Sequence, residues 1–381
     1  MAWKEVTPMK LKEEFVQLAK ENSLSFSELC RRFGVSRKTG YKLLSRYQEA
    51  GKKGLEEKSR RPIHSPTKTP KRLEEMVIQL RLKKPYWGGR KIKAYLEAQG
   101  ETQLPSASAI SKILKRHGLV SSGDNPVTTA YKRFEHELPN DLWQIDFKGH
   151  IAMRQGRCHP LTILDDHSRF SIGLKACANE SESIVKQHLI QVLREYGLPW
   201  RMNFDNGSPW ASTYQRTFKC TSLTLWLMRL GIQISFSRLY HPQTNGKDER
   251  FHRTLKLELL QFYTPWNLEE AQHRFDQWRQ EYNLERPHEA LGMKPPIVRY
   301  KPSARRYPEQ LPPIEYLDQD TVVTVNAAGN IRFQNKVIFI SESFRGQPVA
   351  IRHLSEEHYA LYFCNQKVSQ FDMKILYNKR T

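Results

Sequence analysis

The chain has 381 residues and carries 61 Lys and Arg against 40 Asp and Glu, so its formal net charge is +21. This length allows two to four domains, and the charge favours a polyanionic partner such as DNA. Residues 1–120 hold 27 basic and 12 acidic residues, which is +15 of the +21. No apolar run approaches the roughly 18–20 residues of a bilayer span, and no apolar signal segment begins the chain, which argues against a membrane or secreted protein.

The five cysteines are scattered along the chain without a CxxC pair. This spacing argues against a structural zinc site and against disulfides. The pattern fits a protein of the reducing cytoplasm. The cysteines are Cys30, Cys158, Cys177, Cys220 and Cys364.

Residues 1–56 predict a helix-turn-helix DNA-binding domain. A helix over Ser27–Phe33 ends at Gly34, and Ser36 caps a second helix. The first turn of that second helix would face the DNA major groove. An ordinary helical hairpin is the alternative. The predicted DNA contacts are Arg37, Lys38, Thr39 and Lys42.

Residues 57–72 read as a basic linker, in which Arg60 and Arg61 either enter a DNA minor groove or are simply solvated. Residues 73–120 predict a second helical DNA-binding domain. It has an apolar stripe, a helix that starts near Trp87 and a third helix capped by Ser106, and Trp87 is expected in its core. The predicted DNA contacts here are Arg90, Lys91, Lys112, Lys115 and Arg116.

Residues 121–137 read as a second linker, and the pattern then changes over 138–302 to strands followed by strand–helix alternation. This order predicts a mixed α/β fold. Helices are expected over Ser183–Tyr196 and Tyr214–Leu230, with an irregular stretch at Thr221–Thr224. After a linker over 303–317, five short strands in 318–381 predict a small all-β barrel.

Three carboxylates stand in distinctive surroundings: Asp146 in an alternating strand, Asp205 directly after a strand, and Glu249 near the start of a helix. Hard divalent cations such as Mg²⁺ prefer oxygen ligands. Two such ions, about 3.5–4 Å apart, can activate an attacking oxygen and stabilise a leaving one. The sequence therefore predicts that these three residues bind two metal ions and form a catalytic site for phosphodiester chemistry.

The helix that bears Glu249 supports this interpretation. Its apolar residues would lie on one arc of the helical wheel, and Arg253 and Lys256 would lie beside Glu249, ready to contact the DNA backbone. A surface ion pair between Glu249 and Arg253 is the alternative. Asp248 projects about 100° away and is not assigned to the metals. The arc comprises Phe251, Leu255, Leu259 and Phe262.

A second acidic pair, Asp165-Asp166, precedes His167-Ser168-Arg169. We interpret it as a structural turn in which the acidic groups pair with Arg169, rather than as a metal site.

Five motifs in this order resemble the retroviral-type integrase core of bacterial insertion-sequence transposases, most strongly over residues 137–302. The resemblance implies a ribonuclease H-like core with a mixed five-stranded sheet, two Mg²⁺ or Mn²⁺ ions and direct attack by a DNA 3′-hydroxyl. It also assigns catalysis to Asp146, Asp205 and Glu249, and contacts with element-end DNA to Arg253 and Lys256. The motifs are Trp143–Asp146, Asp165–Arg169, Asp205–Ser208, Pro242–Glu249, and a tail with Tyr282-Asn283, Arg286-Pro287-His288 and Ala290-Leu291.

Two departures from the family pattern stand out. The interval from Asp205 to Glu249 is longer than is usual, and Pro209-Trp210 replaces a usual acidic–aromatic pair. The resemblance implies a cytoplasmic, nucleoid-associated transposase that binds terminal inverted repeats and joins their 3′ ends to target DNA as a homo-oligomer on paired ends. A DNA-binding regulator without catalysis and a nuclease without joining activity are the alternatives.

Overall fold

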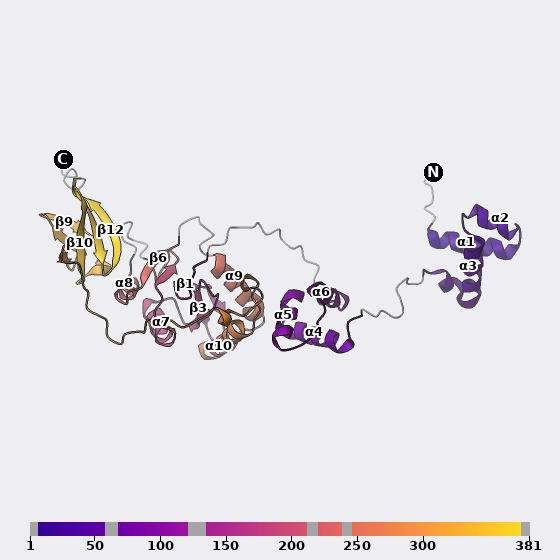
Figure 1. Ribbon diagram of the computed structural model, residues 1–381, viewed down its shortest axis with the longest axis horizontal. Coiled ribbons are helices and arrows are strands. Elements are labelled where there is room, and N and C mark those ends of the chain that lie inside the picture. The colour runs from indigo at the N-terminus through magenta and orange to yellow at the C-terminus, as the bar shows by residue number, and fades with distance from the viewer. Residues whose placement is uncertain (1–6, 58–67, 121–134, 212–219, 238–245, 375–381) are drawn as a thin grey trace. The chain divides into compact units, whose positions relative to one another are not determined.

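The computed structural model describes residues 7–57, 68–120, 135–211, 220–237 and 246–374 (Figure 1). The chain divides into two compact units, 1–68 and 69–381. Of the helices in the described ranges, none is long and apolar enough to cross a membrane. Arg60 and Arg61, predicted as minor-groove contacts, lie outside the described residues.

The first unit is a helix-turn-helix domain, as predicted. Helices α1 (Pro8–Glu21), α2 (Phe26–Arg32) and α3 (Arg37–Ala50) are followed by the 3-10 turn η1 (Gly51–Leu55). The Ser36 Oγ accepts a hydrogen bond from the backbone N–H of Thr39 at 3.2 Å, so it caps α3 as expected. Gly40 lets α3 approach α2 closely, because a Cβ there would lie 2.9 Å from the Cys30 Sγ.

The second helical domain is built from α4 (Lys71–Lys83), α5 (Gly89–Ala98) and α6 (Ala107–Arg116). Val77, Trp87, Ile92 and Ile110 are buried at its centre. Trp87 is therefore a core residue, as predicted. The Ser106 Oγ accepts from the backbone N–H of Ala109 at 3.2 Å and caps α6.

A mixed sheet forms the centre of the region after the second helical domain. Within the described residues it has six strands, β1 (Leu142–Phe147), β2 (Ile151–Ala152), β3 (Arg157–Asp165), β4 (Ser171–Cys177), β5 (Arg201–Phe204) and β6 (Gln233–Phe236). Strands β2, β1 and β4 pair with β3 antiparallel, and β1, β5 and β6 run parallel. The prediction of a mixed sheet is confirmed. The predicted five strands become six because the short β2 extends the edge.

Helices cover both faces of this sheet. On one face α7 (Glu182–Tyr196) and α8 (Ser222–Arg229) pack on buried strand residues such as Ile145 and Ile163. On the other, α9 (Gly246–Leu255) and α10 (Leu268–Leu284) pack on Leu164 and Leu174. Neighbouring residues of β3, such as Ile163 and Leu164, pack on opposite faces because successive side chains of a strand point to opposite sides of the sheet. The 3-10 turns η3 (Glu289–Leu291) and η4 (Pro296–Val298) come after α10.

Helix α9 continues into a π-helical turn, η2 (Lys256–Leu260). A π turn holds more residues than an α turn, so it changes the phase of the helical wheel. Phe251 and Leu255 are buried as predicted, but Phe262 beyond the π turn is 60% exposed. The predicted apolar arc was therefore wrong at its far end.

The predicted irregular stretch at Thr221–Thr224 is instead an ordered helix start. Thr221 and Thr224 form a reciprocal capping box at the beginning of α8. The first part of the predicted helix Tyr214–Leu230 falls in 212–219, outside the described residues.

The C-terminal part is all-β. Strands β7 (Thr321–Thr324), β10 (Pro348–Ser355), β11 (His358–Phe363) and β12 (Gln366–Asp372) form one sheet, and β8 (Asn330–Phe333) pairs with β9 (Lys336–Phe339) in another, with the 3-10 turn η5 (Glu342–Phe344) between β9 and β10. The described strands form two separate sheets, so the predicted closed barrel is not confirmed.

Candidate active site

Asp146 lies near the end of β1, and its side chain is 32% exposed. Burial, and after it the negative charge of Asp205, raises the pKa of the Asp146 carboxyl to about 6. A carboxylate whose charge raises the pKa of another acidic group lies near that group. Asp146 therefore faces Asp205 across a partly desolvated site.

Asp205 follows β5 directly. Strands β1 and β5 are parallel and pair Gln144 with Asn203, so two residues further on the same register leads to Asp146 and Asp205. The backbone N–H of Gly207 donates to the Asp205 Oδ1 at 3.2 Å. A Cβ at position 207 would lie 3.0 Å from the Asp205 Oδ2, so glycine gives the carboxylate room. Burial raises the pKa of Asp205.

Glu180, between β4 and α7, is a further acidic group that the sequence analysis missed. Its negative charge raises the pKa of both Asp146 and Asp205. The Nδ1 of His159 lies 2.8 Å from the Glu180 Oε1. No motif surrounds Glu180 in the sequence, so only the folded chain reveals its proximity to the aspartates.

The first turn of α9 differs from the sequence interpretation. Glu249 is exposed, whereas the neighbouring Asp248 is only 4% exposed. Burial raises the pKa of Asp248 well above its ordinary value, and the charges of Asp146 and Asp166 add to that increase. Asp248, which the sequence analysis directed away from the metal site, is thus the buried acidic residue of this turn, and the charge of Asp146 acts on it.

The structure brings Asp146 and Asp205 together and leaves Glu249 at the surface of α9. Among the described residues no group of three or more His, Cys, Asp or Glu side chains is arranged to hold a metal ion. The role of Glu249 as the third ligand stays a prediction.

The Asp146–Asp205 pair suits a divalent cation chemically. Both groups offer hard oxygen donors, and burial raises the pKa of each, so the charged form of each is disfavoured without a cation. A Mg²⁺ or Mn²⁺ ion prefers such ligands and would neutralise the repulsion between them. The two aspartates therefore fit the metal that the sequence predicts.

His252, about one helical turn after Glu249, lies next to Asp146 and was also missed by the sequence analysis. Its Nδ1 lies 4.0 Å from the Asp146 Oδ2, and its Nε2 lies 2.8 Å from the Thr162 Oγ1. The Thr162 hydroxyl donates to the backbone carbonyl of Asp146 at 2.9 Å. Burial lowers the pKa of His252 to about 4, so the ring is neutral near pH 7. The sequence offered one signal for His252: it stands three residues after Glu249, and residues three apart in a helix are neighbours on its surface.

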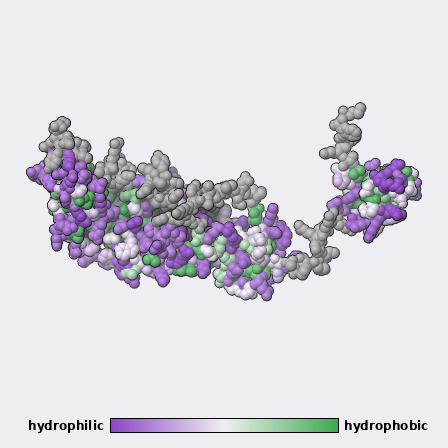
Figure 2. Space-filling view, turned by 45° about the horizontal axis from the view of Figure 1, so that its top comes forward, coloured by the Kyte–Doolittle hydropathy of each residue, from purple (hydrophilic) through white to green (hydrophobic). Residues whose placement is uncertain are grey.

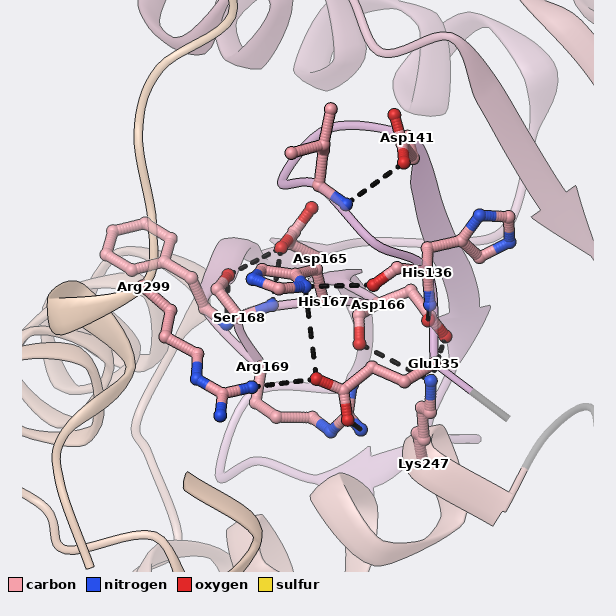
Figure 3. A network of polar contacts seen from close by, with 12 residues as sticks. Glu135, His136, Asp141, Asp165, Asp166, His167, Ser168, Arg169, Lys247 and Arg299 are labelled. Carbon is pink, nitrogen blue, oxygen red and sulfur yellow. Dashed lines mark hydrogen bonds and ion pairs between the residues drawn. The ribbon is translucent and has the colours of Figure 1, made fainter. Parts of the chain in front are cut away.

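The acidic pair Asp165-Asp166 forms a structural turn, as predicted, but its partners are different. The Asp165 carboxylate accepts hydrogen bonds from the backbone N–H groups of Asn140 and Ser168, at 2.7 and 2.8 Å. Asp166 pairs with Lys247 at 2.5 Å. Arg169, the partner expected from the sequence, pairs with Glu135 instead (Figure 3).

The tail motif after α10 has a structural explanation. The Asn283 side chain donates to the Ser171 carbonyl and accepts from its N–H, at 2.9 and 2.8 Å, so it extends the hydrogen bonding of β4. The Arg286 guanidinium forms a buried pair with Glu258 of η2 at 2.9 Å. The motif therefore holds the far end of the helix that carries Glu249.

Most side chains predicted to contact DNA are exposed, and all remain predictions. Figure 2 shows the visible surface of the first unit as largely hydrophilic. Lys91 is only partly exposed, and Arg116 pairs with Glu74 at 2.5 Å. The exposed residues are Arg37, Lys38, Thr39 and Lys42 on α3, Arg90 on α5, Lys112, Lys115 and Arg116 on α6, and Arg253 and Lys256 at α9 and η2.

Family models match three parts of the chain. Two models described as "Integrase core domain" match residues 136–242 and 230–296. A "Helix-turn-helix domain" model matches 11–63, and a "Homeodomain-like domain" model matches 39–114.

Curated relatives include insertion-element proteins. The chain is 25% identical over 305 residues to the uncharacterized 39.2 kDa protein of insertion element IS476 from Xanthomonas euvesicatoria, covering 77% of each chain. It is 25% identical over 211 residues to the transposase for insertion sequence element IS904 from Lactococcus lactis, covering 51% of this chain and 79% of that protein.

Solved structures with a detectable likeness include the HTLV-2 integrase catalytic core domain in complex with magnesium. It is 17% identical, with a TM-score of 0.33, over 43% of this chain and 99% of that one. The chain therefore contains a helix-turn-helix domain and an integrase core domain and is similar to insertion-sequence transposases with an integrase-type core, which indicates a polynucleotidyl transferase of the DDE class.

Proposed function

We propose that the protein binds the terminal inverted repeats of an insertion sequence, produces 3′-hydroxyl ends and joins them to target DNA. The observation that carries this proposal is the Asp146–Asp205 pair, on neighbouring parallel strands of the region that the integrase core model matches. The protein would act on DNA in the bacterial cytoplasm, associated with the nucleoid.

Asp146, Asp205 and Glu249 would hold two Mg²⁺ or Mn²⁺ ions, which when bound polarise the attacking and leaving oxygens. In the first reaction a water oxygen bonds to phosphorus as the bond to the 3′-oxygen breaks, which releases a 3′-hydroxyl. In the second, that hydroxyl oxygen bonds to a target phosphorus as the target's own 3′-oxygen leaves. One phosphodiester replaces another, so joining needs no external energy source.

The chain's basic residues would bind and orient the DNA. The exposed first turn of α3, with Arg37 and Lys38, would read element ends in a major groove. Arg253 and Lys256 lie on the exposed side of the helix that bears Glu249 and would contact the adjacent DNA backbone. Because two ends must be handled together, we expect a homo-oligomer on paired ends. Phosphate contacts make the binding fall steeply with salt.

The test uses the purified full chain, a labelled DNA end taken from the repeats that flank the coding region, and Mg²⁺ or Mn²⁺. We expect a nicked product and a product of joined length from the wild type. Asp146→Asn should lose both while still binding the end. The matched control is Asp141→Asn, which replaces the aspartate directly before the same strand. This variant should keep both the nicked and the joined product.

The alternatives give different results in the same gel. A DNA-binding regulator would shift the labelled end but produce no cut. A nuclease would cut the end and yield no joined product. Retained cleavage by purified Asp146→Asn would reject the assignment of this residue to catalysis.

A further inference from the structure

The first turn of α9 is tied to the end of β3 by a buried ion pair. The Lys247 Nζ lies 2.5 Å from the Asp166 Oδ1 and 3.4 Å from the Asp166 carbonyl oxygen. The Asp166 side chain is 1% exposed and that of Lys247 is 16% exposed. Removing either partner would leave a charge in a largely water-free place, so the pair resists separation.

Asp166 also contacts the strand that carries Asp146. The Gln144 Nε2 donates to the Asp166 Oδ1 at 3.0 Å. Residues two apart in a strand point to the same face, so Gln144 and Asp146 share one side of β1. Asp166 therefore lies between two elements, β1 with Asp146 and α9 with Glu249.

The second carboxylate oxygen of Asp166 is also occupied. The backbone N–H of His136 donates to the Asp166 Oδ2 at 3.0 Å. The neighbouring Glu135 pairs with Arg169 at 3.3 Å and with Arg299 at 2.8 Å (Figure 3). Because both of its oxygens are held, the Asp166 carboxylate has little freedom to turn. The ammonium group of Lys247, which is paired with it, is therefore held in place as well.

We propose that Asp166 is a positioning residue of the catalytic reaction: through Lys247 it fixes the first turn of α9 against β1, and thereby sets where the exposed Glu249 lies relative to Asp146. The inference rests on the proposed function. Lys247 and Glu249 are two residues apart in one helical turn, so a shift of the lysine moves the glutamate with it. An error of about 1 Å in the position of a catalytic group lowers rates by as much as about 100-fold.

The experiment compares the wild type with Asp166→Asn, Asp166→Asn/Lys247→Met and the control Asp141→Asn, all as full chains. Asparagine keeps the shape of Asp166 and can still accept from His136, but it loses the charge that holds Lys247. We expect Asp166→Asn to lower the single-turnover cleavage rate at saturating DNA by about 10-fold to 100-fold. The affinity for the DNA end should stay within about twofold, since the exposed basic residues are unchanged.

Two further measurements separate positioning from folding. Without metal or DNA, amide hydrogen exchange over residues 246–255 should become faster in Asp166→Asn and stay unchanged in Asp141→Asn. The double variant has no unpaired charge in this place, so its melting temperature should recover from that of Asp166→Asn while its cleavage rate should not. A purely structural role predicts that both recover together, and that result would overturn the inference.

The outcomes also separate this inference from the proposed function. If the wild type does not cleave the labelled end, the proposed function fails, and the hydrogen exchange of residues 246–255 still tests the tether. If the wild type cleaves and Asp166→Asn cleaves at a similar rate, the proposed function stands and the positioning role is rejected. Unchanged exchange over 246–255 in Asp166→Asn rejects the tether itself.

Discussion

Replacing Asp146 by asparagine should stabilise the metal-free protein above pH 6 even though it abolishes DNA cleavage. Burial and the nearby Asp205 raise the pKa of the Asp146 carboxyl from 3.8 to about 6. A carboxyl with a raised folded-state pKa binds its proton more tightly in the folded protein than in the unfolded chain. The fold therefore loses stability as the pH rises from about 4 to about 6, and the full penalty persists at higher pH.

The magnitude follows from the size of the shift. At about 1.4 kcal/mol for each pKa unit, a shift of about 2 units corresponds to about 3 kcal/mol. The Asp146 side chain is 32% exposed, so solvent screens part of the repulsion. We expect about 1–2 kcal/mol of added stability for Asp146→Asn at pH 8 after that discount, and none at pH 4. For a region of this size the gain corresponds to an increase of about 3–6 °C in the melting temperature.

The assay is a thermal melt followed by tryptophan fluorescence, because most of the tryptophans lie between residues 138 and 302. Melts at pH 4 and pH 8, with and without Mg²⁺, compare the wild type with Asp146→Asn and Asp141→Asn. Mg²⁺ should raise the melting temperature of the wild type at pH 8 and leave that of Asp146→Asn unchanged. If Asp146→Asn melts no higher than the wild type at pH 8, the charged form of Asp146 does not destabilise the fold and the reasoning is wrong.

Three further changes test other parts of the site and the DNA interface. Gly207→Ala should slow cleavage without lowering the melting temperature, because a Cβ would lie 3.0 Å from the Asp205 Oδ2 and displace that carboxylate. Arg286→Met should destabilise the fold by about 3 kcal/mol, measured by thermal melting, because it leaves Glu258 buried and unpaired; adding Glu258→Gln should restore most of the loss. Arg37→Ala should weaken DNA binding and reduce the slope of log affinity against log salt by about 1, measured by fluorescence anisotropy.

Short-range patterns predicted much of the catalytic region. The alternation around Asp146 predicted β1, the strand predicted directly before Asp205 is β5, and the predicted helix Ser183–Tyr196 differs from α7 by one residue. These elements have strong periodicity and clear ends. The order of the motifs predicted that Asp146 and Asp205 stand on neighbouring strands. In the structure β1 and β5 pair, and the two aspartates come at their ends.

Other features depend on contacts between distant residues and left no local signal. The two-residue β2 is too short for a period to be visible. The π turn after Leu255 changes the helical phase, so a wheel drawn with 3.6 residues per turn placed Phe262 in the core. Glu180 and His252 acquire their places beside the aspartates only when strands and helices pack together.

The orientation of the first turn of α9 is the clearest case of tertiary control over the site. Adjacent helical residues point about 100° apart, so Asp248 and Glu249 cannot both face Asp146, and the wheel alone does not choose between them. In the folded chain Lys247 contacts the buried Asp166, Asp248 is buried and Glu249 is exposed. Mg²⁺ keeps several waters and binds substrate phosphate, so a ligand for it has to remain reachable from the side where DNA lies. By that criterion the exposed Glu249 is suited to the metal, whereas the enclosed Asp248, whose pKa is raised by burial, is suited to a structural role.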